Sequence, residues 1–198
     1  MKKNTQKDIN REKLLNHGVM LLIQQGYHGT GLQEILDAVQ IPKGSFYNYF
    51  ASKEDFAAEI IEHYISPYIS ILESYLAQAE GDSLAALKRY LDEGIAELEK
   101  TQFKGGCLLG NLTGEISDTS DVCRDALQRA LNRYRDVWEL GFSRAQTEGT
   151  IRLDKTAREM ADFWVNAWQG ALLRMKIEQS IVPLIQCQQS LLGDFFKA

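Results

Sequence analysis

Apolar residues along this chain recur every three or four positions, the spacing that places side chains on one face of an α-helix. The first such run ends at Gln25-Gly26, where the glycine is expected to stop the helix, and it comprises Ile9, Leu14, Leu15, Val19, Leu22 and Ile23. Further long helices are expected over about 52–79, 84–99, 122–147 and 154–179, with a shorter segment at 107–116. Pro183 falls in the first turn of a last helix. The chain shows no strand alternation and no internal repeat, so the pattern predicts an all-α fold.

Between the first two long helices, the pattern predicts two short helices joined by a tight turn. The first carries an apolar face, and Thr30 precedes it as an expected N-cap. Gln40-Ile41 ends this helix and Pro42 opens the next, where its fixed φ and missing N–H are tolerated. Phe46 and Phe50 lie four positions apart, as a helix packed into a small core requires.

The remaining surface of the second short helix is rich in hydrogen-bonding groups, supplied by Lys43, Ser45, Tyr47, Asn48 and Tyr49. Gly44 in its first turn would let the backbone approach a phosphate closely. A helix that is apolar on one side and polar on the other suits insertion into the DNA major groove. The alternative is a helical hairpin that packs and binds nothing, but packing alone explains neither Lys-Gly-Ser nor Tyr-Asn-Tyr.

The segment from Gly26-Tyr27 to Ser52-Lys53-Glu54 resembles the N-terminal helix-turn-helix of the TetR family of transcriptional repressors. The residues that carry the resemblance are Gly26-Tyr27, Thr30, Ile35, Lys43-Gly44-Ser45-Phe46-Tyr47, Tyr49-Phe50 and Ser52-Lys53-Glu54. This match covers about a quarter of the 198 residues. It implies a three-helix DNA-binding head over residues 1–55 and a helical ligand-sensing and dimerisation body over residues 56–198.

Carried over position by position, the resemblance implies DNA contacts from Thr30, Lys43, Gly44, Ser45, Tyr47, Asn48, Tyr49 and Lys53. Thr30 would offer its hydroxyl or its backbone N–H to a phosphate, and Tyr49 and Lys53 would hold phosphates across the groove. Lys43, Ser45, Tyr47 and Asn48 are the candidates for base edges, with lysine suited to guanine and asparagine to adenine. Gly31 departs from the family pattern, in which many relatives carry a second hydroxyl residue.

The net charge of −5 is divided unevenly along the chain. Residues 1–55 carry seven Lys or Arg and six Asp or Glu, a net charge of +1, whereas the remainder carries 15 and 21, a net charge of −6. The acidic excess therefore lies in the part that need not touch DNA, and non-specific DNA affinity should be modest and salt-sensitive. Charge alone does not identify a DNA-binding protein here.

Composition excludes several other classes of protein. The sequence has no apolar run long enough for a membrane span and no apolar signal segment, so we expect a cytoplasmic protein without a membrane partner. Three cysteines without a CxxC pair argue against a disulfide framework and against structural zinc. His17, His28 and His63 show no metal-ligand spacing, and nothing in the sequence implies a cofactor or a metal.

The expected long helix before Gln179 carries an apolar stripe beside small residues, formed by Trp164, Trp168, Ala171, Leu172 and Met175. Members of the family dimerise through their last two large helices, so the resemblance implies a homodimer interface over residues 155–196. The alternative is a purely internal face. A dimer is also expected because one short recognition helix reads too few bases to find an operator.

Repressors of this kind respond to a small-molecule inducer bound in the body. Phe103, Trp138 and Trp168 are candidate ligand contacts, although core packing explains aromatic residues of a helical body as well. Cys107 follows Lys104-Gly105-Gly106 and opens an expected helix, a position that favours the reactive thiolate. Its Gly-Cys-Leu segment resembles a subgroup of the family that responds to electrophiles or oxidants. The alternative is a small residue that fills a tight turn.

The sequence argues against two other classes of function. An enzyme is disfavoured because the sequence contains no phosphate loop, no HExxH motif and no Ser-His-Asp order. A helical adaptor or small-molecule-binding protein of the same fold that does not bind DNA is the second alternative. Lys43-Gly44-Ser45 and Tyr47-Asn48-Tyr49 favour a DNA-binding transcriptional repressor instead.

Overall fold

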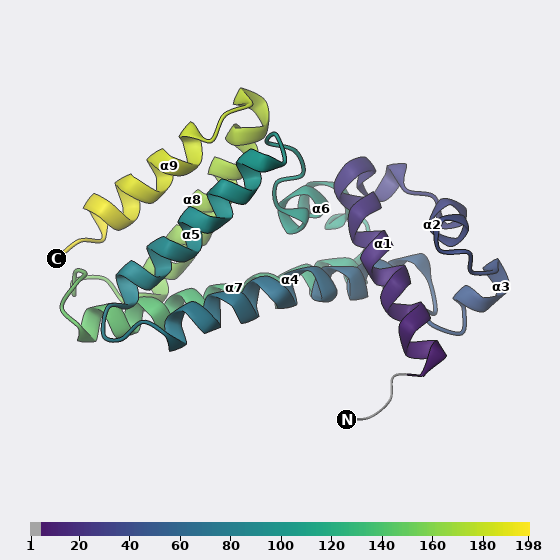
Figure 1. The fold of residues 1–198 in the computed structure, drawn as a ribbon, viewed down its shortest axis with the longest axis horizontal. Helices are drawn as coiled ribbons and strands as arrows, with labels where there is room; N and C mark the ends of the chain where they lie inside the picture. Colours follow the sequence, from purple (N-terminus) through teal and green to yellow (C-terminus); the bar gives the residue numbers. More distant parts are fainter. Residues whose placement is uncertain (1–4) are drawn as a thin grey trace. The chain divides into compact units, whose positions relative to one another are not determined.

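The computed structural model describes residues 5–198, and over these residues the chain forms nine α-helices and one C-terminal π-helical segment (Figure 1). The predicted all-α fold is confirmed: within the described range, strand-like pairing is confined to a single bridge between Ile151 and Lys197. No helix in this range is long and apolar enough to cross a membrane. Residues 1–4 lie outside the described residues.

The chain divides into two compact units. The first unit, residues up to Ile65 together with Leu108–Ala130, holds α1 (Gln6–Gly29), α2 (Leu32–Val39), α3 (Lys43–Phe46), α6 (Leu108–Ile116) and the first parts of α4 (Lys53–Ala77) and α7 (Asp121–Thr147). The second unit, Ser66–Cys107 and Leu131–Ala198, holds α5 (Ser83–Lys100), α8 (Ala157–Glu178), α9 (Val182–Gln188), the π-helical η1 (Gln189–Phe195) and the rest of α4 and α7. The division expected at residue 55 stays a prediction.

In the first unit, α1 packs against both α2 and α6. Phe46, Phe50 and Phe56 form a ring cluster with centroid separations of 5.3, 5.4 and 4.6 Å. Each of these three side chains is at most 2% exposed, which confirms the predicted core role of Phe46 and Phe50. The polar residues of α3 are therefore carried on a rigid aromatic base.

Several predicted helix ends are confirmed, but two differ: α1 runs to Gly29, past the predicted stop at Gly26, which is non-helical (φ 74°), and the predicted cap of α2 is wrong. The Ser52 Oγ accepts the Asp55 N–H at 2.9 Å at the start of α4, and Pro183 lies in the first turn of α9 as expected. Thr30, however, is not the N-cap of α2, since Gly31 occupies that position. Thr30 closes α1 instead, because its buried hydroxyl donates to the Gly26 carbonyl at 2.6 Å.

The core of the second unit is aromatic. Trp138 and Trp164 are fully buried with ring centroids 4.8 Å apart, and Trp168 stacks on Trp164 at 5.3 Å. Helix α9 packs against both α8 and α5 (Figure 1). All five residues of the predicted interface stripe, Trp164, Trp168, Ala171, Leu172 and Met175, lie in the interior of the protomer.

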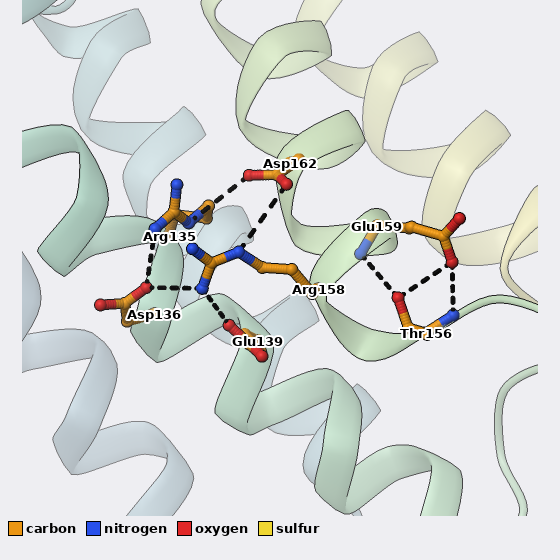
Figure 2. Close-up of polar contacts among 7 residues, drawn as sticks. All are labelled: Arg135, Asp136, Glu139, Thr156, Arg158, Glu159 and Asp162. Carbon is orange, nitrogen blue, oxygen red and sulfur yellow. Dashed lines mark hydrogen bonds and ion pairs between the residues drawn. The ribbon is translucent and has the colours of Figure 1, made fainter. Parts of the chain in front are cut away.

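The start of α8 is fixed by a capping box and by ion pairs to α7 (Figure 2). Thr156 accepts the Glu159 N–H at 3.1 Å, and the Glu159 carboxylate accepts the Thr156 N–H at 2.8 Å. The Thr156 N–H, and after it the Thr156 hydroxyl, which donates to the same carboxylate at 2.9 Å, hold the pKa of Glu159 below its usual value. Arg158 lies between the two helices and pairs with Glu139 at 2.6 Å and Asp136 at 3.1 Å. The side chains of this network are mostly exposed, so they orient α8 more than they stabilise it.

Candidate nucleic-acid interface and sensing site

Helix α3 is only four residues long, and its backbone continues as a turn to Phe50. The amide N–H of Asn48 donates to the Ser45 carbonyl at 3.1 Å, and that of Tyr49 donates to the Phe46 carbonyl at 2.9 Å. Pro42 precedes the helix, and Gln40 takes a left-handed conformation (φ 56°) that ends α2. The predicted helix-turn-helix is therefore present, with a shorter second helix than expected.

Most of the predicted DNA-contacting residues share one accessible surface. Lys43, Gly44, Tyr47 and Asn48 are exposed, and Ser45 and Tyr49 are half-buried. Tyr47 is 59% exposed although it follows the fully buried Phe46, so the apolar and polar sides separate as the sequence predicted. A Cβ added at Gly44 would meet nothing within 4 Å. Packing within the chain therefore gives no reason for glycine at this position.

Three of the predicted DNA contacts form hydrogen bonds inside the protein, and the weakest of these is accepted by the Tyr49 hydroxyl from the Asn10 side-chain amide at 3.4 Å. The Thr30 hydroxyl is buried and donates to Gly26, which leaves its backbone N–H as the group for a phosphate. The Lys53 ammonium donates to the Tyr27 carbonyl at 2.9 Å and lies 4.3 Å from the centre of the Tyr27 ring. Its partial burial lowers the pKa of Lys53. An ammonium has three N–H donors, so one internal bond does not use up this side chain.

Glu115 and Tyr27 form a contact at this end of the first unit that the sequence did not indicate. The Glu115 carboxylate of α6 accepts the backbone N–H of Tyr27 at 2.7 Å. Burial raises the pKa of Tyr27 to about 12, with smaller contributions from Cys123 and Glu54. No local pattern could have revealed this contact, because Glu115 and Tyr27 are 88 positions apart.

Cys107, the predicted sensing residue, is half-buried and directly precedes α6. The Gln169 side-chain N–H donates to its sulfur at 3.3 Å. The neighbouring Gly106 has φ +67°, and a Cβ there would lie 3.1 Å from Cδ of Lys176, so the lysine stem passes close to this loop. The sequence had offered Lys104 as the nearby lysine; Gln169 and Lys176 come from α8, far along the chain.

The other predicted sensing residues lie in the same unit as Cys107. Phe103 is half-buried in the turn after α5 with a left-handed φ of 62°, and Trp138 and Trp168 belong to the aromatic core. Tyr90 of α5 packs edge-on against Trp138 at 6.1 Å, and its hydroxyl lies 3.3 Å from that of Tyr134. The pKa of Tyr90 is raised chiefly by burial and then by Tyr134, Tyr68 and Cys107.

The aromatic core contains two buried donors without a partner. The indole N–H groups of Trp138 and Trp164 form no hydrogen bond to any described residue, although both side chains are fully buried. Such donors are uncommon in folded proteins and call for an acceptor. A separate cavity of about 660 Å³ lies between α5, α9 and η1, and none of the four predicted sensing residues is among its lining residues: Lys88, Asp92, Ile95, Ile185, Gln188, Gln189, Gly193 and Asp194.

The remaining cysteines have less reactive surroundings. Cys123 is fully buried, and burial raises the pKa of its thiol. Burial also raises the pKa of Cys187 to about 11. Within residues 5–198, no group of three or more His, Cys, Asp or Glu side chains could hold a metal ion.

A helix-turn-helix with an exposed polar surface and a helical body with an aromatic core define a class of DNA-binding regulators. Residues 14–60 match the family model described as bacterial regulatory proteins, tetR family, and residues 83–191 match that of the tetracyclin repressor-like C-terminal domain. The chain belongs to the TetR family of transcriptional regulators. It is accordingly a DNA-binding regulator with a ligand-responsive C-terminal domain, and its family and curated relatives are regulators rather than enzymes.

Two curated repressors are similar over most of their length. The HTH-type transcriptional repressor DhaR of Mycobacterium sp. strain GP1 is 36% identical over 176 residues, which cover 89% of this chain and 87% of DhaR. The HTH-type transcriptional repressor NemR of Escherichia coli K12 is 30% identical over 184 residues, covering 93% and 92% of the two chains. The crystal structure of reduced E. coli NemR superimposes with a TM-score of 0.83 at 28% identity, covering 96% of this chain and 97% of that one.

Proposed function

We propose that this chain is a homodimeric repressor that binds operator DNA through α3 and the following turn and leaves it when a small molecule or electrophile acts on the body. One observation carries the DNA-binding part. Lys43, Tyr47 and Asn48 are exposed beside the buried Phe46, Phe50 and Phe56, and a Cβ at the exposed Gly44 would meet nothing within 4 Å. Exposed donors on a rigid support are what reading of base edges requires.

The roles within this surface follow from chemistry and exposure. Lys43, Ser45, Tyr47 and Asn48 are placed for base edges, since all four lie in α3 or the turn that follows it. Gly44 lets the sugar–phosphate backbone approach α3. Tyr49, the backbone N–H of Thr30 and the free donors of Lys53 would bind phosphates, which set register without reading sequence.

Dimerisation through residues 155–196 is supported by the surface that one protomer leaves exposed. The predicted tryptophan stripe points inward, but Phe163, Leu173 and Ile177 of α8 and Val182 of α9 are 50, 50, 81 and 47% exposed. Apolar side chains gathered on neighbouring helices mark an interaction surface. Two protomers would then present two copies of α3 to two operator half-sites. An Ile177→Glu variant should sediment as a monomer, whereas Leu140→Glu, at an exposed apolar position on α7, should remain a dimer.

Cys107 is the proposed sensing residue. It is half-buried at the start of α6 and bonded to Gln169, and the relative NemR has been crystallised in a form designated reduced. With an electrophile such as N-ethylmaleimide, the thiolate sulfur would add to one alkene carbon and the other carbon would take a proton. The C=C bond becomes a single bond, one C–S bond forms, and no group leaves.

The unpartnered indole N–H groups of Trp138 and Trp164 extend the proposal to reversible inducers. Their ring centroids are 4.8 Å apart, so both donors lie in the same part of the core. An inducer that reaches them would carry hydrogen-bond acceptors such as carbonyl oxygens on a planar apolar frame, because the surrounding side chains are aromatic.

A single titration tests the function. The purified chain is titrated with DNA from upstream of its own gene, before and after treatment with N-ethylmaleimide, at salt between about 50 and 200 mM. Tight, salt-dependent binding that is lost on alkylation, and retained in alkylated Cys107→Ser, is the expected result. If alkylation does not alter binding, the cysteine mechanism is contradicted, and release by a reversibly bound small molecule is the explanation that stays. Failure to bind this DNA or any sequence selected from a random pool would favour the non-DNA-binding adaptor.

A further inference from the structure

The backbone at Tyr27, in the last turn of α1, is held from two sides by oppositely charged side chains. Its N–H donates to the Glu115 carboxylate of α6 at 2.7 Å, and its carbonyl accepts from the Lys53 ammonium of α4 at 2.9 Å. Hydrogen bonds to ionised groups are about twice as strong as neutral ones. The turn that leads into the helix-turn-helix is therefore tied to two other helices of the same unit.

The contact with Glu115 is built into the backbone conformation of the turn. Gly26 has φ 74° and ψ 179°, a combination that essentially only glycine adopts. A Cβ at this position would lie only 2.7 Å from Oε2 of Glu115, so the glycine also makes room for the carboxylate. His28 adds two contacts, from its N–H to Glu115 Oε2 at 3.4 Å and from its ring Nε2 to the Glu115 carbonyl at 3.2 Å.

The turn also connects to the start of α2. The buried Thr30 hydroxyl donates to the Gly26 carbonyl at 2.6 Å, and Gly31, the next residue, is the N-cap of α2. Lys53 is the first residue of α4. A shift of the Tyr27 backbone would therefore move both ends of the segment that carries α2 and α3: its start, through Thr30, and its end, through Lys53.

We propose that Glu115 is a positioning residue for operator binding, which holds the Gly26–Thr30 turn so that α2 and α3 keep the orientation that DNA requires. This inference rests on the proposed DNA-binding function. Glu115 itself does not touch DNA in this proposal. Its carboxylate acts only through the backbone of the turn.

Electrostatics and positioning predict opposite effects for loss of the Glu115 charge. DNA is a polyanion, so removal of a negative charge from the DNA-binding unit should strengthen binding. Loss of the turn contact should weaken binding instead. Asp118 is an exposed acid three residues further on and supplies the control, because Asp118→Ala removes the same charge without touching the turn.

The experiment compares operator affinity of the full-length wild type, Glu115→Ala, Glu115→Gln and Asp118→Ala at one salt concentration, with thermal unfolding of each. We expect Glu115→Ala to bind roughly tenfold more weakly, with Asp118→Ala binding equally or more tightly than the wild type. Glu115→Gln keeps an acceptor oxygen and should recover part of the loss, and it serves as the test variant if Glu115→Ala does not fold. Should the folded Glu115 variants bind as tightly as Asp118→Ala, the positioning role is refuted. Failure of the wild type itself to bind DNA would overturn the proposed function, and this inference with it.

Discussion

The backbone N–H of Tyr27 and the carboxylate of Glu115 lie 2.7 Å apart although 88 residues separate them in the chain. This bond joins the C-terminal end of α6 to the last turn of α1. On the other side of Tyr27, the Lys53 ammonium donates a second hydrogen bond to the Tyr27 carbonyl. The turn that leads into the helix-turn-helix is therefore held by α6, a helix that comes much later in the sequence than α2 and α3. Stability, positioning and DNA contact can be separated by the substitutions that follow.

Replacement of Gly44 by alanine should separate DNA binding from folding. A Cβ there meets nothing within 4 Å and Gly44 has no left-handed φ, so alanine should be neutral or raise the free energy of unfolding by about 0.4–1 kcal/mol. The same methyl group would stand between α3 and a phosphate, and operator affinity should fall. Urea unfolding and an operator titration check the two parts. Unchanged operator affinity would contradict close approach of the backbone at this position.

Lys43 and Lys53 should differ both in stability and in salt dependence. A lysine that contacts a phosphate contributes roughly one unit to the slope of log affinity against log salt, so Lys53→Met should reduce this slope by about 1, whereas Lys43→Met, at a proposed base-reading position, should weaken discrimination at one base pair. Only Lys53 is bonded inside the protein, to the Tyr27 carbonyl and ring, so only Lys53→Met should lower the melting temperature. If Lys53→Met keeps the wild-type salt slope, Lys53 does not contact a phosphate and only stabilises the turn at Tyr27.

Alkylation by iodoacetamide should distinguish the three cysteines. Burial raises the pKa of Cys187 to about 11 from 9.0, so less thiolate is present at any pH below 11 and its reaction should be slow. Its rate should rise about tenfold per pH unit, and by about a hundredfold on unfolding at about pH 8, as the pKa returns to its ordinary value. Cys123 should react only on unfolding because it is fully buried. Mass spectrometry of peptides should find Cys107 modified first; early modification of Cys187 would contradict this order.

The start of α8 allows a cap to be compared with an ion pair. Thr156→Ala removes the acceptor for the Glu159 N–H and should lower the free energy of unfolding by about 1 kcal/mol. Arg158→Ala removes exposed ion pairs to α7 (Figure 2), which typically contribute less than about 1 kcal/mol, and its effect should be smaller and should shrink in high salt. Denaturant unfolding at low and high salt measures both. A larger loss for Arg158→Ala would show that the network acts cooperatively.

The elements of the fold were predictable because their signals are local. Helical spacing, a helix start near residue 52, Pro183 in a first turn and the pair Phe46 and Phe50 each depend on neighbours within a few positions. Thr30 shows where local reasoning stops. Its hydroxyl could accept a hydrogen bond from the helix that follows or donate one to the helix that precedes it. In the structure the buried hydroxyl donates to the Gly26 carbonyl of the preceding helix.

Partners from distant parts of the chain were not predictable. Gln169 lies 62 positions from Cys107, and no sequence pattern around either residue predicts that they are in contact. The same holds for the inward orientation of Trp164 and Trp168, because an apolar stripe looks alike whether it faces the protomer core or a second copy. The π-helical η1 after α9 also has no recognised signature in the sequence.

Glu115 is bound by main-chain N–H groups, which every residue except proline possesses. Side chains at positions 27 and 28 can therefore diverge during evolution without loss of these two bonds, whereas Gly26 and Glu115 are constrained as a pair. The same reasoning applies to the construction of hybrid regulators. A chimera that takes only the N-terminal helices of this protein would leave Glu115 behind, so a transplantable DNA-reading module has to include Leu108–Ile116 as well.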